Sequence, residues 1–133
     1  MMTKYSNLTC LIVDDYSTAR RIIKKNLNEI GFSCLEAEDG EQALELILQK
    51  PLNLVLADVK MPNKNGLELL EDIRDDDNLK VMPVILTMIE PLEELISTGT
   101  ELGMNDYLVK PFDVFTLAKV LDKVIIMEGG ESF

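Results

Sequence analysis

The sequence predicts an α/β protein with a doubly wound parallel sheet, a (βα)5 chain in which each of five strands precedes a helix. Short apolar runs alternate five times with longer segments whose apolar residues follow the helical period. The 133 residues are 47% hydrophobic, which suffices for one buried core, and no linker or change of composition divides them. We therefore expect one domain over residues 1–133, with its core at about 8–127 and a frayed tail at 128–133.

The first unit combines a buried strand with an amphipathic helix. The apolar run at residues 8–13 has the length of a strand, and residues 17–30 keep the 3.6-residue period of a helix. The expected buried face of this helix consists of Ala19, Ile22, Ile23, Leu27 and Ile30. Ser17 is the expected N-cap, and Gly31 stands where a left-handed residue commonly ends a helix.

The remaining units repeat this pattern with shorter elements. We expect strands at 33–37, 52–58, 82–87 and 105–109, and helices at about 41–49, 66–75, from Pro91 onward, and at about 114–127. Pro91 suits a first helical turn, where its missing N–H costs no hydrogen bond. The Ser-Thr-Gly-Thr run at 97–100 has low helix propensity, so it predicts a weak, interrupted fourth helix.

Composition excludes several classes of function. The net charge of −11 leaves no basic footprint for nucleic acid. No apolar run is long enough to cross a membrane, and the N-terminus lacks a signal-peptide pattern, so we expect a cytoplasmic protein without membrane insertion. Cys10 and Cys34 lie in apolar segments, where buried, reduced thiols are expected. The absence of histidine excludes Ser-His-Asp and Cys-His catalysis and disfavours a structural zinc site.

One pronounced cationic run lies in the first expected helix, where Arg20, Arg21, Lys24 and Lys25 recur at helical spacing. A solvated helix face is the favoured interpretation, because charged residues usually occupy the exposed side of an amphipathic helix. A docking patch for an acidic partner is the alternative.

Polar side chains gather at the ends of four predicted strands. The first strand ends in Asp14 and Asp15, the third in Asp58 and the fourth in Thr87, and Lys110 follows the fifth. Parallel α/β sheets bind ligands at the carboxyl ends of their strands. If the strand order is 2-1-3-4-5, these five residues meet at one edge of the sheet.

The three acids at this edge predict a cation and a reaction. Three neighbouring carboxylates need a counter-charge, and Mg²⁺ prefers carboxylate, carbonyl and water oxygens. Phosphoryl transfer relies on positioning and charge neutralisation, and carboxylates serve as covalent phosphate acceptors. Asp58 is the expected nucleophile, because it is central among the strand ends and a flexible loop is expected after it. Thr87 and Lys110 are placed to bind phosphoryl oxygens. Helix capping or exposure to solvent is the alternative for the acids.

With these residues in place, the sequence resembles the receiver domain of bacterial two-component response regulators, in particular the stand-alone, CheY-like chemotaxis regulators. The resemblance covers about residues 8–127. It rests on the segments "VDDYSTARRI", "EAEDGEQAL", "ADVKMPNKNGLELL", "VILT" and "NDYLVKPF", which are highly specific only in combination. The resemblance implies a flavodoxin-like fold with strand order 2-1-3-4-5.

The resemblance assigns roles to the acids. Asp58 would be the phosphorylated residue of a histidine-to-aspartate relay. Mg²⁺ would bind Asp15, Asp58 and the backbone carbonyl of Lys60 directly, and Asp14 through water.

It also implies a switch. Thr87 and Lys110 would contact the phosphoryl group, and the rotamer of Tyr107 would follow Thr87. The face formed by the fourth helix, fifth strand and fifth helix would respond. The bond between Lys110 and Pro111 would be cis.

The partners implied by the resemblance are proteins. A histidine kinase or phosphotransfer protein would supply the phosphoryl group, and a downstream effector protein would read it, with no direct contact to nucleic acid. We expect a monomer or a phosphorylation-dependent dimer. The protein would assist its own phosphorylation and dephosphorylation rather than act as an enzyme on another substrate.

Three positions are notable against the family pattern. Met88 stands where the family usually has a small residue, and its long side chain would narrow the path to the phosphoryl group. Ile89 makes the following loop apolar, so that an exposed Met-Ile pair could serve as a partner or dimer contact. Lys60 adds a second cation near the pocket, which bears on the lifetime of the phosphoryl group.

Three other functions are disfavoured. A flavodoxin-like cofactor protein would place phosphate in the loop after the first strand, where two acids repel it. Aspartate-dependent phosphohydrolases place nucleophile and acid two residues apart, whereas Asp14 and Asp15 are adjacent, and this chain has little room for a cap. An unphosphorylated adapter is disfavoured because all site positions are present.

Overall fold

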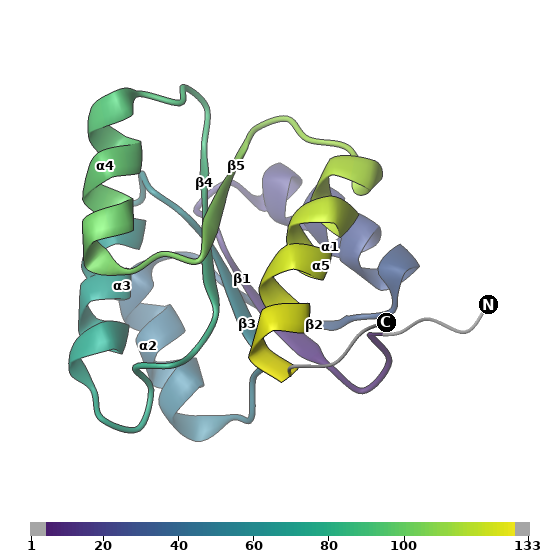
Figure 1. Ribbon diagram of the computed structural model, residues 1–133, viewed down its shortest axis with the longest axis horizontal. Helices are drawn as coiled ribbons and strands as arrows, with labels where there is room; N and C mark the ends of the chain where they lie inside the picture. The colour runs from purple at the N-terminus through teal and green to yellow at the C-terminus, as the bar shows by residue number, and fades with distance from the viewer. Residues whose placement is uncertain (1–4, 130–133) are drawn as a thin grey trace.

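The computed structural model describes residues 5–129, which form a five-stranded parallel sheet of order β2-β1-β3-β4-β5 between two layers of helices (Figure 1). The strands are β1 (Thr9–Val13), β2 (Ser33–Ala37), β3 (Leu54–Asp58), β4 (Val84–Met88) and β5 (Asp106–Val109). The helices are α1 (Ser17–Ile30), α2 (Gly40–Gln49), α3 (Gly66–Asp75), α4 (Glu93–Leu102) and α5 (Val114–Gly129). The predicted fold class and strand order are confirmed, and the predicted frayed tail lies largely outside the described residues.

The sheet separates two apolar cores. Helices α1 and α5 cover one face, and α2, α3 and α4 cover the other (Figure 1). Alternate residues of β1 serve the two sides: Cys10 and Ile12 join the core under α1 and α5, whereas Leu11 and Val13 join the other. Because both faces are covered, the inner strands are apolar along their length and only their ends are available for polar chemistry.

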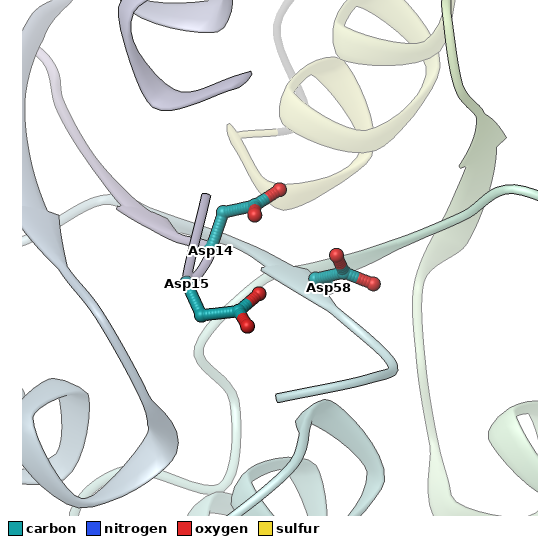
Figure 2. A group of neighbouring side chains, drawn as sticks. All are labelled: Asp14, Asp15 and Asp58. Carbon is teal, nitrogen blue, oxygen red and sulfur yellow. The ribbon is translucent and has the colours of Figure 1, made fainter. Parts of the chain in front are cut away.

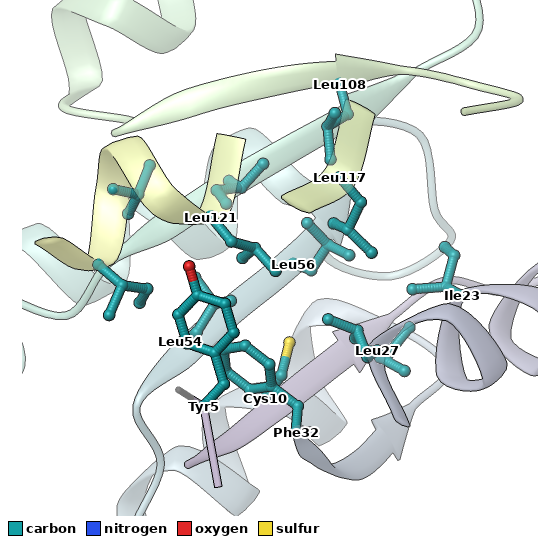
Figure 3. Close-up of a cluster of buried hydrophobic side chains, with 14 residues drawn as sticks. Tyr5, Cys10, Ile23, Leu27, Phe32, Leu54, Leu56, Leu108, Leu117 and Leu121 are labelled. Atoms are coloured by element: carbon teal, nitrogen blue, oxygen red, sulfur yellow. The ribbon is translucent and has the colours of Figure 1, made fainter. Parts of the chain in front are cut away.

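The core under α1 and α5 also holds the start of the described chain. Figure 3 shows Tyr5 among the buried side chains of this core. Its ring stacks on Phe32 with ring centroids 5.0 Å apart, and its hydroxyl donates a hydrogen bond to Asp122 of α5. The segment before β1 is therefore fastened to α5 and to the start of β2.

Helix α1 differs from its prediction at two positions. Its N-cap is Tyr16 rather than Ser17, and no side chain caps the helix. Instead, the Tyr16 N–H donates to Asp14 Oδ1 at 2.9 Å, so the aspartate itself turns the chain into the helix. Ile22 is 55% exposed, because α1 packs on the sheet through Ile23 and Leu27 while Ile22 lines an open groove. The C-terminal prediction is confirmed: Gly31 has a φ of 118° and ends the helix.

Helix α4 is neither started by Pro91 nor interrupted. Its N-cap is Leu92, whose extended backbone leaves Pro91 before the helix. The helix then runs unbroken to Leu102, through the residues expected to interrupt it. Gly99 is buried there, and a Cβ at this position would lie 2.7 Å from Met104 Sδ. Close packing against Met104, rather than a break in the helix, explains this glycine.

The two cysteines are free thiols, as predicted. Cys10 is buried, but Cys34 is only half-buried, because β2 is an edge strand. Cys10 and Cys34 are register partners in the pairing of β1 with β2. Burial raises the pKa of Cys10, and it raises that of Cys34 to about 11, so both thiols stay protonated near neutral pH.

The length and hydropathy of the described helices show whether any of them could span a membrane. Within residues 5–129, no helix combines the length and apolar character needed to span a membrane.

Candidate functional site

The carboxyl edge of the sheet brings three aspartates together. Asp14 and Asp15 follow β1 and Asp58 ends β3, and Figure 2 shows the three side chains grouped at this edge. One carboxylate oxygen from each lies within 4.8 Å of the other two. Asp14 and Asp58 are buried, whereas Asp15 is exposed. The clustering inferred from the strand ends is therefore present.

Lys110 connects two of these acids. Its Nζ donates to Asp14 Oδ2 at 2.8 Å and to Asp58 Oδ2 at 2.7 Å. Burial by itself would lower the pKa of the Lys110 ammonium, but its hydrogen bonds to the two aspartates outweigh that effect, and the pKa is raised. Burial raises the pKa of Asp58, and the hydrogen bonds from Lys110 and from the Lys60 backbone offset only part of this.

The cluster has the charge and donor set for a hard divalent cation. Three carboxylates face the single ammonium of Lys110, and within the described residues no hydrogen bond reaches the carboxylate of Asp15. The Oδ1 atoms of Asp14 and Asp58 accept backbone N–H groups from Tyr16 and Lys60. Aspartate oxygens in this number suit Mg²⁺, which binds oxygen ligands together with water. The residues present therefore fit a magnesium ion.

Thr87 and Tyr107 occupy different sides of the same edge. Thr87 pairs with Asp58 in the β3–β4 register and is buried, and its hydroxyl has no hydrogen bond to another described residue. Tyr107 is half-buried and packs against the core under α2, α3 and α4. Its register partner in β4 is Leu86, while Leu108 pairs with Thr87. The ring of Tyr107 thus lies beside the layer that contains α4.

The loop after Asp58 is tied down, in contrast to the expected flexible loop. The Asn63 side chain donates to Asp39 Oδ2 at 2.8 Å, and the Gly40 N–H donates to the carbonyl of Lys64 at 2.8 Å. Asp39 also caps α2. The chain must return sharply from β3 to α3, and anchoring it to the start of α2 fixes that path.

The end of β1 is held in a similar way by β2. The Asp14 N–H donates to the carbonyl of Ala37 at 3.1 Å, and Arg20 Nη1 donates to the carbonyl of Asp14 at 2.6 Å. Arg20 Nε also donates to Glu36 Oε1 of β2 at 3.0 Å. The prediction of a solvated basic face is therefore wrong for Arg20, whose side chain is only 13% exposed, although Arg21 is exposed.

Four supporting residues were missed from the sequence: Arg20, Glu36, Asp39 and Asn63. None stands at a predicted strand end, so the reasoning that found the acids could not find them. A usable signal was the acidic segment "EAEDG" at residues 36–40, which begins in the edge strand β2 beside β1 and supplies none of the predicted metal ligands.

The prediction of an exposed Met88-Ile89 pair is correct for Ile89 and wrong for Met88. Ile89 is 73% exposed, but Met88 is 1% exposed, because β4 continues one residue further than predicted and turns Met88 into the core beside α4. Met88, Ile89 and Lys60 nevertheless line one small pocket of about 150 Å³ with Asp58. The approach to Asp58 on this side is therefore narrow.

A larger apolar groove is lined in part by Lys110. It has a volume of about 350 Å³ and runs between the start of α1 and the loop after β5. Its lining includes Tyr16, Ile22, Ile89 and Phe112. The peptide bond between Lys110 and Pro111 at its edge is cis, as expected.

Comparison with known proteins shows that this chain is similar to response regulator receiver domains. The model of the response regulator receiver domain matches residues 10–122. The chain is 42% identical to chemotaxis protein CheY-3 of Vibrio cholerae over 119 residues, which cover 89% of this chain and 92% of that protein. It is 38% identical to chemotaxis protein CheY of Pseudomonas aeruginosa over 121 residues, or 90% and 98% of the two chains.

Solved structures agree with these sequence relatives. The structure of chemotaxis protein CheY4 of Vibrio cholerae superposes with a TM-score of 0.83 at 30% identity, covering 88% of this chain and 98% of that one. A CheY-like receiver domain of Methanospirillum hungatei gives a TM-score of 0.82 at 27% identity, covering 95% and 100%.

Proposed function

Because this chain belongs to the response regulator receiver domain family and has CheY-like relatives, we propose that it is the phosphoacceptor of a histidine-to-aspartate relay and that Asp58 is its phosphorylated residue. The observation that carries the proposal is the pocket in which Lys110 bridges Asp14 and Asp58 beside the exposed Asp15. Chemotaxis is the process we assign to it, by analogy with these relatives. The chain acts in the cytoplasm as one receiver domain.

The reaction is a transfer of a phosphoryl group between side chains. An oxygen of the Asp58 carboxylate attacks phosphorus, and the bond from phosphorus to the donor's imidazole nitrogen breaks. The electron pair of that bond stays on the imidazole, which then takes a proton from water. The product is an acyl phosphate on Asp58 and a neutral histidine on the donor.

The residues around Asp58 have separate roles in the phosphoryl transfer. Asp15, Asp58 and the carbonyl of Lys60 would hold Mg²⁺ directly and Asp14 would hold it through water, and the ion would supply charge neutralisation for the phosphoryl oxygens. Lys110 moves its hydrogen bond from the Asp58 carboxylate to a phosphoryl oxygen. The hydroxyl of Thr87, which has no partner among the described residues, donates to another oxygen.

The switch follows from that last contact. When Thr87 turns toward the phosphoryl group, it leaves space beside β4, and Tyr107 turns inward from the α4 side of the sheet. The face of α4, β5 and α5 changes shape, and an effector protein reads the change. The same site assists loss of the phosphoryl group to water, with Lys60 and Ile89 flanking the approach to Asp58.

The apolar groove beside Lys110 is where the phosphodonor docks. The exposed side chains of Tyr16 and Ile22 line this groove together with Lys110. A histidine kinase or phosphotransfer protein that covers this groove with an apolar helix face brings its histidine toward Asp58. Arg21 and Lys25, both exposed on α1, favour a donor with an acidic rim.

Intact mass after incubation with acetyl phosphate tests the proposal. With Mg²⁺, the wild-type chain gains one phosphoryl group, which is lost in base, and the gain disappears when Mg²⁺ is chelated. Asp58→Asn shows no gain, whereas Asp75→Asn, an exposed aspartate on α3, behaves like wild type. A gain that persists in Asp58→Asn, or no gain in wild type from either acetyl phosphate or phosphoramidate, contradicts the proposal.

A further inference from the structure

Arg20 makes contacts that a solvent-facing helix residue would not make. From the first turns of α1 its guanidinium donates to the carbonyl of Asp14 at 2.6 Å and to Glu36 at 3.0 Å. Glu36 is itself held from the other side by Lys24 at 3.4 Å. One charged chain thus runs from the edge strand β2 to the peptide that joins Asp14 and Asp15.

The carbonyl of Asp14 needs this partner because the sheet ends there. β1 pairs with β2 and β3 only as far as Val13. The Asp14 N–H still reaches Ala37, but the Asp14 carbonyl finds no sheet donor, and Arg20 supplies one. A backbone carbonyl at a buried position without a partner costs about 1–3 kcal/mol.

This peptide decides where Asp15 lies. The Asp15 carboxylate has no hydrogen bond to another described residue, so its position depends on the backbone that carries it. The bond from the Asp14 N–H to Ala37 holds the preceding Val13–Asp14 peptide, and the bond from Arg20 to the Asp14 carbonyl holds the Asp14–Asp15 peptide itself. Rotation of this peptide would move Asp15 away from Asp58.

We propose that Arg20, oriented by Glu36, is a positioning residue for the magnesium site: it fixes the Asp14–Asp15 peptide so that Asp15 meets Asp58 at the ion. This inference rests on the proposed function, since it assumes that the aspartates bind Mg²⁺. Edge strand β2, which contributes no ligand, acquires a role through Glu36.

Electrostatics alone predicts the opposite change in Mg²⁺ affinity when Arg20 is removed. Arg20 is a cation near the site, so its removal should tighten Mg²⁺ binding if only electrostatics mattered. Loss of positioning weakens binding, and residues that hold metal ligands in place typically contribute 10–100-fold in affinity. The sign of the change in affinity therefore separates the two explanations.

The test is isothermal titration calorimetry of Mg²⁺ into five variants beside wild type. We expect Arg20→Ala to weaken binding roughly tenfold. Arg20→Lys should fall between Arg20→Ala and wild type, because lysine keeps the charge but cannot reach both acceptors through a fork. Arg21→Ala removes the same charge one residue away, from an exposed side chain, and should bind like wild type.

The fourth variant is Glu36→Gln, with Glu38→Gln as its matched control. Both remove one negative charge from the end of β2, but only Glu36 contacts Arg20. Glu36→Gln should weaken Mg²⁺ binding more than Glu38→Gln does. This pair decides the matter if Arg20→Ala does not fold.

A kinetic readout distinguishes positioning from general damage. In Arg20→Ala the rate of phosphorylation by acetyl phosphate should need more Mg²⁺ but reach the wild-type maximum, because Asp58, Thr87 and Lys110 are untouched. The inference is overturned if Arg20→Ala binds Mg²⁺ as tightly as wild type or more tightly, or if Glu36→Gln and Glu38→Gln bind Mg²⁺ equally well. Either result leaves the proposed function standing. Wild type that binds no Mg²⁺ overturns both.

Discussion

The segments that follow β1 and β3, beside the acids, and the segment that follows β4, beside Thr87, are held in different ways. After β1, Arg20 and Ala37 fix the backbone of Asp14, and after β3, Asp39 fixes Asn63. After β4, Ile89 and Leu92 are largely exposed, and no side chain caps the start of α4. The acids thus lie in a cross-linked region, and the loop from β4 to α4 lies in a loosely held one.

The far end of α4 resembles the cross-linked region. Arg74 of α3 donates to the carbonyl of Gly103, just after α4, and to the side chain of Asn105. Helix α4 is therefore fastened at its C-terminal end and loose at its N-terminal end. Loosely packed segments with few buried contacts are the ones that rearrange at low cost. We infer that phosphorylation moves the start of α4 and leaves its end and the aspartate loops in place.

The largest expected effect is that of Gly66→Ala, in the cross-linked region. A Cβ at Gly66 would lie 2.9 Å from the carbonyl carbon of Asp58 and closer still to its oxygen. Because backbone rather than a flexible side chain stands in the way, β3 or α3 must shift. We expect the free energy of unfolding in urea to fall by about 3 kcal/mol and Mg²⁺ binding to weaken. A fall under about 1 kcal/mol would show that this region yields more easily than its contacts imply.

Arg74→Ala should have the next largest effect. It leaves the carbonyl of Gly103 and the side chain of Asn105 without their charged donor. We expect a loss of about 2 kcal/mol in the free energy of unfolding, and faster amide hydrogen exchange at the end of α4. Arg21→Ala, which removes an exposed arginine, serves as the control and should change stability little. Unchanged exchange at Gly103 would show that Arg74 is not what fastens α4.

Asp39→Ala should cost about 1 kcal/mol at neutral pH, the usual value of a helix N-cap. The hydrogen bond from the Gln42 N–H, followed by that from Asn63, holds the pKa of Asp39 below its ordinary value. This contribution is therefore fully present above about pH 4 and is lost as the pH falls through the lowered pKa of the folded state. The stability difference from wild type should shrink in acid. A difference that stays constant down to pH 2 would assign the loss to packing alone.

Gly99→Ala, in α4, should have the smallest effect. The new Cβ would meet the flexible end of Met104 at 2.7 Å and Leu86 Cδ1 at 3.3 Å, and these nearest neighbours are side-chain atoms. Replacing glycine inside a helix gains about 1 kcal/mol, which offsets the displacement of Met104. We expect the free energy of unfolding to stay within about 1 kcal/mol of wild type. Urea unfolding beside Gly66→Ala compares the same substitution against backbone and against a flexible side chain, and equal losses would show that the backbone around Gly66 yields as easily as Met104 does.

Much of the fold could be predicted because its signals are local. Apolar runs and helical periods located all five βα units, and Asp14, Asp15 and Asp58 stood at strand ends. The errors arose where a tertiary contact overrides a local preference. Tyr16 replaces Ser17 as N-cap because Asp14 binds its N–H, and Gly99 is set by Met104.

The supports of the site could not be predicted in the same way. Arg20 belongs by spacing to a basic helix face, and only the packing of α1 on β2 turns it toward Glu36. Likewise, the contact between Asp39 and Asn63 joins segments 24 residues apart. Ligand positions follow from where strands end, whereas the residues that hold those ligands follow from how the layers pack.

Amide hydrogen exchange with and without acetyl phosphate, in the presence of Mg²⁺, tests the distinction between the two regions most directly. Phosphorylation should change exchange from Thr87 through the first turn of α4 and around Tyr107, and leave it unchanged at residues 36–40 and 60–66. Thr87→Ala should still accept the phosphoryl group by mass but lose the change in α4. Equal changes in both regions, or a change in α4 that survives in Thr87→Ala, would contradict the division into a fixed metal-binding region and a mobile switch.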